Sequence, residues 1–459
     1  MLRPRMAGRR DERARRGAGH AGRVRAAMLA ALLLLLLPPA SALAKPRGGT
    51  LRVGTSGDYA PFSVAKDANP PRYEGFDIEL ARRYARDRGL KIEWVRFRWP
   101  TLLRDLEAGR FDVAMSGVTV GPSRSAAGSF SVPLVETGAV ALVLDAARFG
   151  TPESLDVDSV RIAVNAGGHL EGVAHSQFPH ATLLAIPDNA GVVKALSDGA
   201  ADAALTDSAE ASHWEAELPD VKRFGPFTQD RKAFLVAAGA TELAADLDRW
   251  LLEREADGSL DALRREQLGP GPWPRVAEPL SALVAAIDER LSLMPWVAVA
   301  KRRDGLALVA PAREAAVLDE STSAVLADAK ARGVAAPPEP LVRAFFEAQM
   351  EAARQVQRDV SRDASPSAPE SLPDLEASLR PAISRIGARI ARLVLALPPD
   401  TDRDRIAKAL GTGVRTTWVT PASRDAIARA LAALVASRET KPASSEARDT
   451  APAIPRARQ

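Results

Sequence analysis

The clearest chemical constellation lies between residues 279 and 358 and consists of Arg290, Lys301, Arg313 and Gln357. Arg290 and Lys301 are eleven residues apart, about three turns of an α-helix, so one predicted helix presents both on the same face. Arg313 opens the next predicted helix. Cations grouped in this way bind carboxylates. The alternative is a set of solvated charges, which the surface of any helix carries.

A second candidate is Glu171, which follows the turn Asn165-Ala-Gly-Gly168 at the point where a helix should begin. A carboxylic acid can donate a proton near neutral pH when burial raises its pKa. A glutamate in the first turn of a helix can instead simply complement the helix dipole. Both roles are open for Glu171.

The elements that must position Glu171 alternate between strand and helix from Gly49 onward. The predicted strands cover residues 51–54, 91–97, 111–115, 160–164 and 203–207. Strands separated by helices predict a parallel α/β architecture. Two such groups predict two lobes, the first at about 48–140 and 236–268 and the second at about 141–235.

The run Gly269-Pro-Gly-Pro-Trp-Pro274 admits neither a regular helix nor a regular strand. We therefore place a linker at 271–277, between an α/β domain at 45–270 and a second domain at 278–437. The second domain is predicted to be all-helical, with Pro295 bending the helix that carries Arg290 and Lys301. Its apolar stripe recurs at spacings of three and four residues and comprises Leu375, Leu379, Ile383, Ile386, Ile390 and Leu393.

The N-terminal residues 1–44 have the anatomy of a secretory signal peptide. A basic stretch up to Arg25 precedes about a dozen apolar residues, and Ser41-Ala-Leu-Ala44 supplies small residues for cleavage before Lys45. The alternative is an uncleaved N-terminal anchor. We expect a periplasmic protein that has no membrane segment after cleavage, and a disordered polar tail at 438–459.

The amino-acid composition excludes several kinds of chemistry and of binding partner. The 459 residues include no cysteine, which excludes disulfides, thiol catalysis and cysteine-ligated metals. Residues 1–44 hold nine arginines and two acidic residues, so 53 basic and 56 acidic residues remain (62 less nine, 58 less two). A chain with this balance gives no reason to expect nucleic acid as a partner.

Several motifs of the first half resemble the polar amino-acid-binding family of periplasmic receptors. They are Arg52 to Phe62, Tyr73-Glu-Gly-Phe-Asp77, Arg110 to Gly117 and Leu205-Thr-Asp207. Within that superfamily, Trp99-Pro100, Asn165-Ala-Gly-Gly168 with Glu171, and Pro187-Asp-Asn189 are similar to cyclohexadienyl dehydratases. The resemblance implies a two-lobed (type II) binding-protein fold. It also implies conversion of prephenate to phenylpyruvate, and of arogenate to phenylalanine, without a cofactor or a metal.

The resemblance also implies roles for single residues. Glu171 would be the general acid, and Arg124 would hold a ligand carboxylate. The other implied binding residues are Tyr59, Trp99, Ser116, Gly117, Thr119, Asn165, Asp207 (the receptor position for a ligand ammonium) and Lys232. Two positions depart from the pattern: His169 replaces a threonine, and Gly172 replaces a lysine. His169 either takes over one of the missing contacts or is exposed.

The second half resembles all-helical chorismate mutases, and its extra C-terminal helices resemble the secreted subclass. The matching motifs include Ile287-Asp-Glu-Arg290, Val299-Ala-Lys301, Ala312-Arg-Glu-Ala315 and Phe345-Phe346 with Gln357. By resemblance, Arg290 and Arg313 contact the carboxylate-bearing parts of chorismate, and Lys301 and Gln357 reach the ether oxygen. Glu314 would hold the ring hydroxyl, and Arg380 is the additional arginine of the subclass. Ala353 departs from the pattern, because the family has serine or threonine there.

The two resemblances predict an exported bifunctional enzyme with chorismate and prephenate as substrates, and we expect a homo-oligomer. One alternative is a periplasmic amino-acid-binding receptor fused to a chorismate mutase. Another is an inactive scaffold whose helical half only mediates association.

Overall fold

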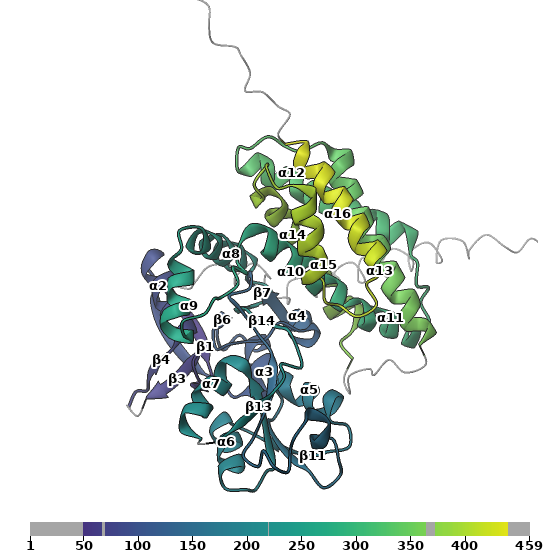
Figure 1. Cartoon of the computed structure of the whole chain (residues 1–459). Helices are drawn as coiled ribbons and strands as arrows, with labels where there is room; N and C mark the ends of the chain where they lie inside the picture. The colour runs from purple at the N-terminus through teal and green to yellow at the C-terminus, as the bar shows by residue number, and fades with distance from the viewer. Residues whose placement is uncertain (1–48, 67–68, 219, 364–371, 439–459) are drawn as a thin grey trace, which may run out of the picture. The chain divides into compact units, whose positions relative to one another are not determined.

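A computed structural model describes residues 49–66, 69–218, 220–363 and 372–438 (Figure 1). The predicted signal peptide, and all of the predicted tail except Arg438, lie outside the described residues. All of the described residues belong to one compact unit. Within the described ranges, no helix has both the length and the apolar character needed to cross a membrane.

The first lobe is built on a five-stranded sheet with the order β5-β1-β6-β15-β7. Strand β1 runs parallel to β5 and β6, whereas β15 runs antiparallel to β6 and β7. The bounds are β1 (Thr50–Thr55), β5 (Lys91–Arg96), β6 (Val113–Ala114), β7 (Gly128–Phe130) and β15 (Leu235–Ala237). A small antiparallel sheet adds β2 (Asp58–Tyr59), β3 (Ser63–Lys66) and β4 (Arg72–Glu74).

The second lobe repeats this plan with the order β11-β10-β12-β9-β13. Strand β10 runs parallel to β11 and β12, and β9 runs antiparallel to β12 and β13. The bounds are β9 (Ala139–Val143), β10 (Arg161–Asn165), β11 (Thr182–Ile186), β12 (Ala203–Asp207) and β13 (Lys222–Phe224). This lobe buries two apolar clusters of its own.

Two short antiparallel strands, β8 (Val135–Thr137) and β14 (Asp230–Lys232), carry the chain between the lobes. The chain re-enters each sheet after these crossings without a helical crossover. A parallel neighbour needs such a crossover, so β9 and β15, the strands that follow the crossings, run antiparallel to both of their neighbours. The predicted two-lobed fold is confirmed, but the expectation of parallel strands was wrong for β9 and β15.

Helices flank both sheets (Figure 1). In the α/β half they are α2 (Phe76–Asp87), α3 (Leu102–Glu107), α4 (Pro122–Ala127), α5 (His169–Gln177), α6 (Asn189–Ser197), α7 (Ser208–Glu217), α8 (Thr241–Ala256) and α9 (Ser259–Leu268), with 3-10 turns η2 (Trp99–Thr101) and η3 (Pro152–Leu155). Helix α2 illustrates why they form. Phe76, Leu80 and Tyr84 recur on one face at a spacing of four and are buried.

The second half is helical, as predicted. It comprises α10 (Pro279–Ser292), α11 (Met294–Arg303), α12 (Pro311–Ala331), α13 (Glu339–Arg362), the π-helical turn η4 (Leu375–Leu379), α14 (Arg380–Ala396), α15 (Arg403–Gly413) and α16 (Pro421–Ala436). Helix α13 packs against α11, α12 and α16, and α14 packs against α10 and α12. Most of the predicted apolar stripe on η4 and α14 is buried in this core.

The expectation of one bent helix carrying both Arg290 and Lys301 was wrong. Helix α10 ends at Ser292, and a new helix, α11, begins at Met294. Pro295 explains the break, because proline cannot donate to the preceding turn but fits the first turn of a new helix.

The first lobe and the helical half share one apolar core, which includes Leu106, Phe130, Leu283 and Leu393. Polar contacts reinforce it. Ser125 donates to Glu289 at 2.9 Å, and Arg389 pairs with the other oxygen of Glu289 while donating to the Phe130 carbonyl at 2.6 Å. Glu289 and Arg389 are both buried. The first lobe therefore packs on helices α10 and α14 through a contact that includes a buried ion pair.

Candidate functional site

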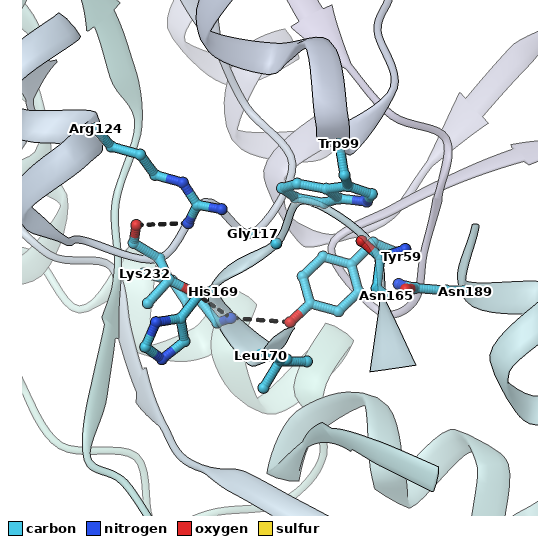
Figure 2. Close-up of a pocket in the computed structure, with 11 residues that line it drawn as sticks. Tyr59, Trp99, Gly117, Arg124, Asn165, His169, Leu170, Asn189 and Lys232 are labelled. Atoms are coloured by element: carbon cyan, nitrogen blue, oxygen red, sulfur yellow. Dashed lines mark hydrogen bonds between the residues drawn. The ribbon is translucent and has the colours of Figure 1, made fainter. Parts of the chain in front are cut away.

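A first pocket lies at the junction of the two lobes and encloses about 330 Å³ of space, part of it open to solvent (Figure 2). The first lobe and the strand that returns from the second lobe supply Tyr59, Trp99, Gly117, Thr119, Arg124 and Lys232. The second lobe supplies Asn165, Gly168, His169, Leu170 and Asn189. Eight of these eleven residues were predicted as site residues.

The backbone of the pocket wall requires a glycine at position 117. Its φ of 65° lies in the left-handed region that favours glycine, and a Cβ atom would come within 2.7 Å of the rings of Tyr59 and Phe62. Its N–H donates to Asp77 at 2.7 Å. Burial raises the pKa of Asp77 to about 7, against the opposing effect of that hydrogen bond and of Lys232.

Lys232 and Asp207 form a buried ion pair with 2.7 Å between Nζ and Oδ2. Lys232 also donates to the Tyr59 hydroxyl and the Thr119 hydroxyl, each at 2.9 Å (dashed in Figure 2). The Tyr59 hydroxyl in turn donates to Asp207. Burial, followed by the negative charge of Asp207, raises the pKa of Tyr59 well above its ordinary value, so the phenol stays protonated.

Arg124, in α4, is a buried cation at the edge of this pocket. One of its guanidinium nitrogens donates to the Thr119 carbonyl at 2.8 Å, and its Cζ lies 6.0 Å from the centre of the Trp99 ring. Burial lowers its pKa to about 10, so the guanidinium stays charged at neutral pH. No carboxylate of the described residues forms an ion pair with it.

Sequence reasoning left His169 either in a binding role or exposed. The ring lines the pocket, and its Nε2 lies 2.9 Å from Oδ1 of Asp230. Asp230 also accepts from the Thr228 hydroxyl at 2.8 Å. Burial alone would raise the pKa of Asp230, but His169, Lys232 and Thr228 outweigh burial and hold that pKa below its usual value. His169 therefore faces the pocket with a carboxylate behind it.

Three predicted site residues of the first half do not line the pocket: Ser116, Glu171 and Asp207, whose side chain is fully buried beside Lys232. Ser116 is fully buried and bonds to Ser56 through its hydroxyl at 2.9 Å. Glu171, in the first turn of α5, accepts the N–H of Gly167 at 2.7 Å. In this conformation the Glu171 carboxylate binds the backbone of the turn that precedes its own helix.

Sequence reasoning did not name the pocket residues Gly168, Leu170 and Asn189 as site residues, although it singled out the motifs that contain Gly168 and Asn189, and it did not name Asp230 behind His169. Asp230 carried a usable signal, because it lies two residues before Lys232 and alternate residues of a strand share a face. The side chain of Asn189 donates to the buried Glu210 at 3.0 Å, and that pairing has no sequence signal.

A second pocket, of about 690 Å³ including open space, lies within the helical half. It brings together every predicted mutase residue, and these residues come from five helices, α10 to α14. They are Arg290, Lys301, Arg313, Glu314, Gln357 and Arg380, with Ala353 beside them. The break between α10 and α11 leaves Arg290 and Lys301 in the same pocket, so the inference that they point the same way holds although the single helix does not.

Lys301 and Gln357 orient one another in this pocket. Lys301 Nζ donates to Gln357 Oε1 at 2.9 Å and to the Leu308 carbonyl at 2.6 Å. Because the amide oxygen faces the ammonium, the amide nitrogen of Gln357 is the end left to donate, and it lies 3.6 Å from the sulfur of Met294. Burial lowers the pKa of Lys301.

Arg290 is buried, and its Nη1 has no hydrogen-bond partner among the described residues. Burial lowers its pKa to about 10, which leaves it cationic at neutral pH. Glu314 pairs with Arg354 at 2.6 Å, a pocket residue that the sequence reasoning missed. Arg380 pairs with Glu376 on the preceding turn. Arg290 is thus a cation of this pocket whose charge no described carboxylate compensates.

Comparison with known proteins assigns both halves. Residues 51–270 match the bacterial extracellular solute-binding proteins, family 3, and residues 281–358 match chorismate mutase type II. The chain is 36% identical to a cyclohexadienyl dehydratase of Pseudomonas aeruginosa over 231 residues, which is 49% of this chain and 85% of that protein. It is 29% identical to the lysine/arginine/ornithine-binding periplasmic protein of Escherichia coli over 231 residues, covering 47% and 86% of the two chains.

A solved structure of an ancestral amino-acid-binding protein, described as a precursor of cyclohexadienyl dehydratase, is 35% identical. The match covers 48% of this chain and 96% of that one, with a TM-score of 0.45. The chain belongs to the family 3 bacterial extracellular solute-binding proteins through its α/β half and carries a chorismate mutase type II domain in its helical half.

Proposed function

We propose that this chain is a bifunctional enzyme that converts chorismate to prephenate in its helical half and prephenate to phenylpyruvate in its α/β half. One observation carries the proposal. Each pocket holds a buried arginine, Arg124 or Arg290, that forms no ion pair with a carboxylate in the described part of the chain. A buried charge is costly without a partner, so each pocket favours an anionic ligand. Chorismate and prephenate each carry two carboxylates.

In the helical half, the proposed reaction is a Claisen rearrangement that needs no acid, base or covalent intermediate. Arg290 and Arg313 bind the carboxylate-bearing parts and fold the substrate into its reactive conformer. Lys301 has one N–H left after its bonds to Leu308 and Gln357, and the Gln357 amide is a second donor. Both donors then stabilise negative charge on the breaking ether oxygen.

In the α/β half, the proposed reaction consumes one proton. The prephenate dianion and a proton give the phenylpyruvate anion, carbon dioxide and water. The bond to the ring carboxylate and the bond to the ring hydroxyl break, and the electron pair from the first enters the new aromatic ring. Aromatisation drives the step, so the chain must bind the carboxylates and protonate the departing hydroxyl.

Arg124 is the proposed partner of the side-chain carboxylate, and Tyr59 and Trp99 form the wall beside the ring. The similarity to a cyclohexadienyl dehydratase supports Glu171 as the proton donor. To act, its carboxyl group must leave the N–H of Gly167, which closure of the lobes around a substrate can drive. The proposed role therefore requires a local rearrangement at the start of α5.

The full chain incubated with chorismate tests both halves at once. We expect phenylpyruvate from the wild type, prephenate accumulation from Glu171→Gln, and no chorismate consumption by Lys301→Ala. Prephenate as the end product of the wild type would indicate a mutase fused to a receptor. If the wild type turned over neither substrate, the result would support the alternative of an inactive scaffold.

The same proposal includes a periplasmic location after removal of residues 1–44, a domain division at 271–277 and a homo-oligomeric assembly. Membership of an extracellular binding-protein family supports export. Mass spectrometry of the mature N-terminus and light scattering of the purified protein test the location and the assembly.

A further inference from the structure

Strand β14, which returns the chain from the second lobe, has one face toward the first pocket and one face away from it. Lys232 lines the pocket, and Asp230 lies behind the pocket residue His169 at 2.9 Å. Successive side chains of a strand point to opposite faces, so Arg231 points away from the pocket. The groups that Arg231 meets on that side belong to the helical half.

Arg231 contacts two groups of the helical half. Its Nη1 lies 2.7 Å from Oδ2 of Asp288 in α10, and its Nη2 donates at 2.5 Å to the carbonyl of Gly413, the last residue of α15. A Cβ atom at position 413 would come within 2.5 Å of Val284, so a glycine allows this close approach. Two directional hydrogen bonds from one planar guanidinium fix its orientation as well as its position.

The neighbouring strand β8 takes part in the same network. Glu136 is the cross-strand partner of Arg231, and its Oε1 lies 3.5 Å from Arg231 Nε. The same oxygen accepts from Arg415 of the helical half at 2.7 Å, and the backbone N–H of Arg415 donates to Oδ1 of Asp288 at 2.8 Å. Arg231, Asp288, Arg415 and Glu136 thus form a closed ring of two arginines and two carboxylates, which we call the anchor ring.

The ribbon formed by β8 and β14 needs support from outside. Each strand has three residues, and a two-stranded ribbon is marginally stable by itself. The first lobe holds the edge of β14, because the Val120 N–H donates to the Arg231 carbonyl at 2.8 Å and the Ala233 N–H donates to the Val118 carbonyl at 3.0 Å. Bonds along one edge still allow the ribbon to tilt about that edge, whereas contacts on its face, such as those of the anchor ring, oppose a tilt.

We propose that Arg231 and Asp288 are positioning residues through which the helical half holds the wall of the dehydratase pocket in its binding geometry. The inference rests on the proposed dehydratase function and deepens it. Without this ion pair, β14 and its pocket-facing residues can shift, and a shift of about 1 Å in a binding group can cost on the order of a hundred-fold in rate. The helical half thus serves both reactions, although its own pocket serves one.

The kinetics of the full chain on prephenate test this role. Arg231→Met should raise the KM for prephenate about tenfold, whereas kcat should change by less than about threefold, because the proposed proton donor Glu171 belongs to α5. The variant should fold, since Asp288 still accepts the N–H groups of Arg415 and Thr416. Arg231→Lys, which keeps the charge, should recover part of the loss. An unchanged KM in Arg231→Met would overturn the proposal.

Two further variants separate positioning from a general loss of stability. Arg88→Met removes an ion pair of the first lobe, with 2.6 Å between Arg88 and Asp246, that lies outside the anchor ring and should leave the KM for prephenate unchanged. Arg231→Met/Asp288→Asn should raise that KM no further than Arg231→Met does, because both changes break one contact. An equal rise in Arg88→Met, or additive effects in the double variant, would refute the role of the pair.

Amide hydrogen exchange of the full chain tests the anchor ring without any turnover. Residues 134–137 and 229–233 should exchange about tenfold faster in Arg231→Met than in the wild type, and at the wild-type rate in Arg88→Met. A wild type that turns over no prephenate would refute the dehydratase function, yet these exchange rates would still test whether the helical half holds the ribbon. Equal exchange of these residues in Arg231→Met and the wild type would refute that support.

Discussion

Replacing Gln357 by glutamate should make the mutase activity depend on acid. In the wild type, the amide oxygen of Gln357 faces the Lys301 ammonium at 2.9 Å, so the amide nitrogen can donate at any pH. A glutamate in the same place meets the same ammonium as a carboxylate, which has no proton to donate. It becomes a donor only when protonated.

The size of the effect follows from the number of donors. Loss of one donor to a developing oxyanion costs roughly 3–4 kcal/mol, or about 10²–10³ in kcat, so Gln357→Glu should be this much slower at pH 7. Glutamate has a reference pKa of about 4.3, and the Lys301 charge opposes protonation. The protonated fraction therefore rises about tenfold for each unit of falling pH, and the rate should rise about a hundred-fold between pH 7 and pH 5.

The assay is the loss of chorismate absorbance from pH 5 to pH 8 with the full chain. The wild type should show no such rise on acidification, and Gln357→Met, which lacks a donor at every pH, should be slow throughout. Turnover of prephenate by Gln357→Glu should match the wild type and serves as the folding control. A Gln357→Glu profile with the same shape as that of the wild type would refute the reasoning.

Three other predictions follow from buried charges. Arg124→Met should raise the KM for prephenate at least tenfold and leave chorismate consumption unchanged, because the substituted cation belongs to the first pocket alone; an unchanged KM would contradict its role. The folded-state pKa of Asp77 is raised to about 7 from 3.8, so its contribution to stability is fully present below about pH 4 and is lost as the pH rises to 7. Asp77→Asn should therefore match the wild type at pH 4 and exceed it by on the order of 4 kcal/mol at pH 8 in urea unfolding; a constant difference between the two pH values would argue against the shift. Arg389→Met leaves Glu289 buried and unpaired and should cost about 3–5 kcal/mol in the same experiment, with partial recovery in Arg389→Met/Glu289→Gln; a loss below about 1 kcal/mol would show that the pair is not buried in solution.

The sequence predicted the elements better than their connections. The spacing of Arg290 and Lys301 indicated a shared direction, which the pocket bears out, although Pro295 starts a new helix between them. The reversed direction of β9 and β15 was missed because it depends on how the chain crosses between the lobes. A local pattern of apolar residues carries no information about that crossing.

Charged residues were the harder class to interpret. Arg385 and Arg389 look like solvated side chains of an amphipathic helix, yet Arg385 donates to the carbonyls of Ser125, Ala126 and Gly128 in the first lobe. Such contacts join residues about 260 positions apart, so no local signal predicts them. For Glu171, the sequence predicted the position at the start of a helix. It could not predict where the carboxylate points, because that direction depends on the conformation of the cleft.

The apolar core that continues from the first lobe into α10 and α14 has a consequence for inheritance. A gene cut at residues 271–277 would yield two products, each with an uncovered apolar face and one half of the Ser125–Glu289–Arg389 contact. Such fragments would aggregate rather than work separately. Once that contact had formed, recombination that separated the two halves would no longer yield two folded proteins. Mutations that stabilise one half therefore also help to keep the other half folded.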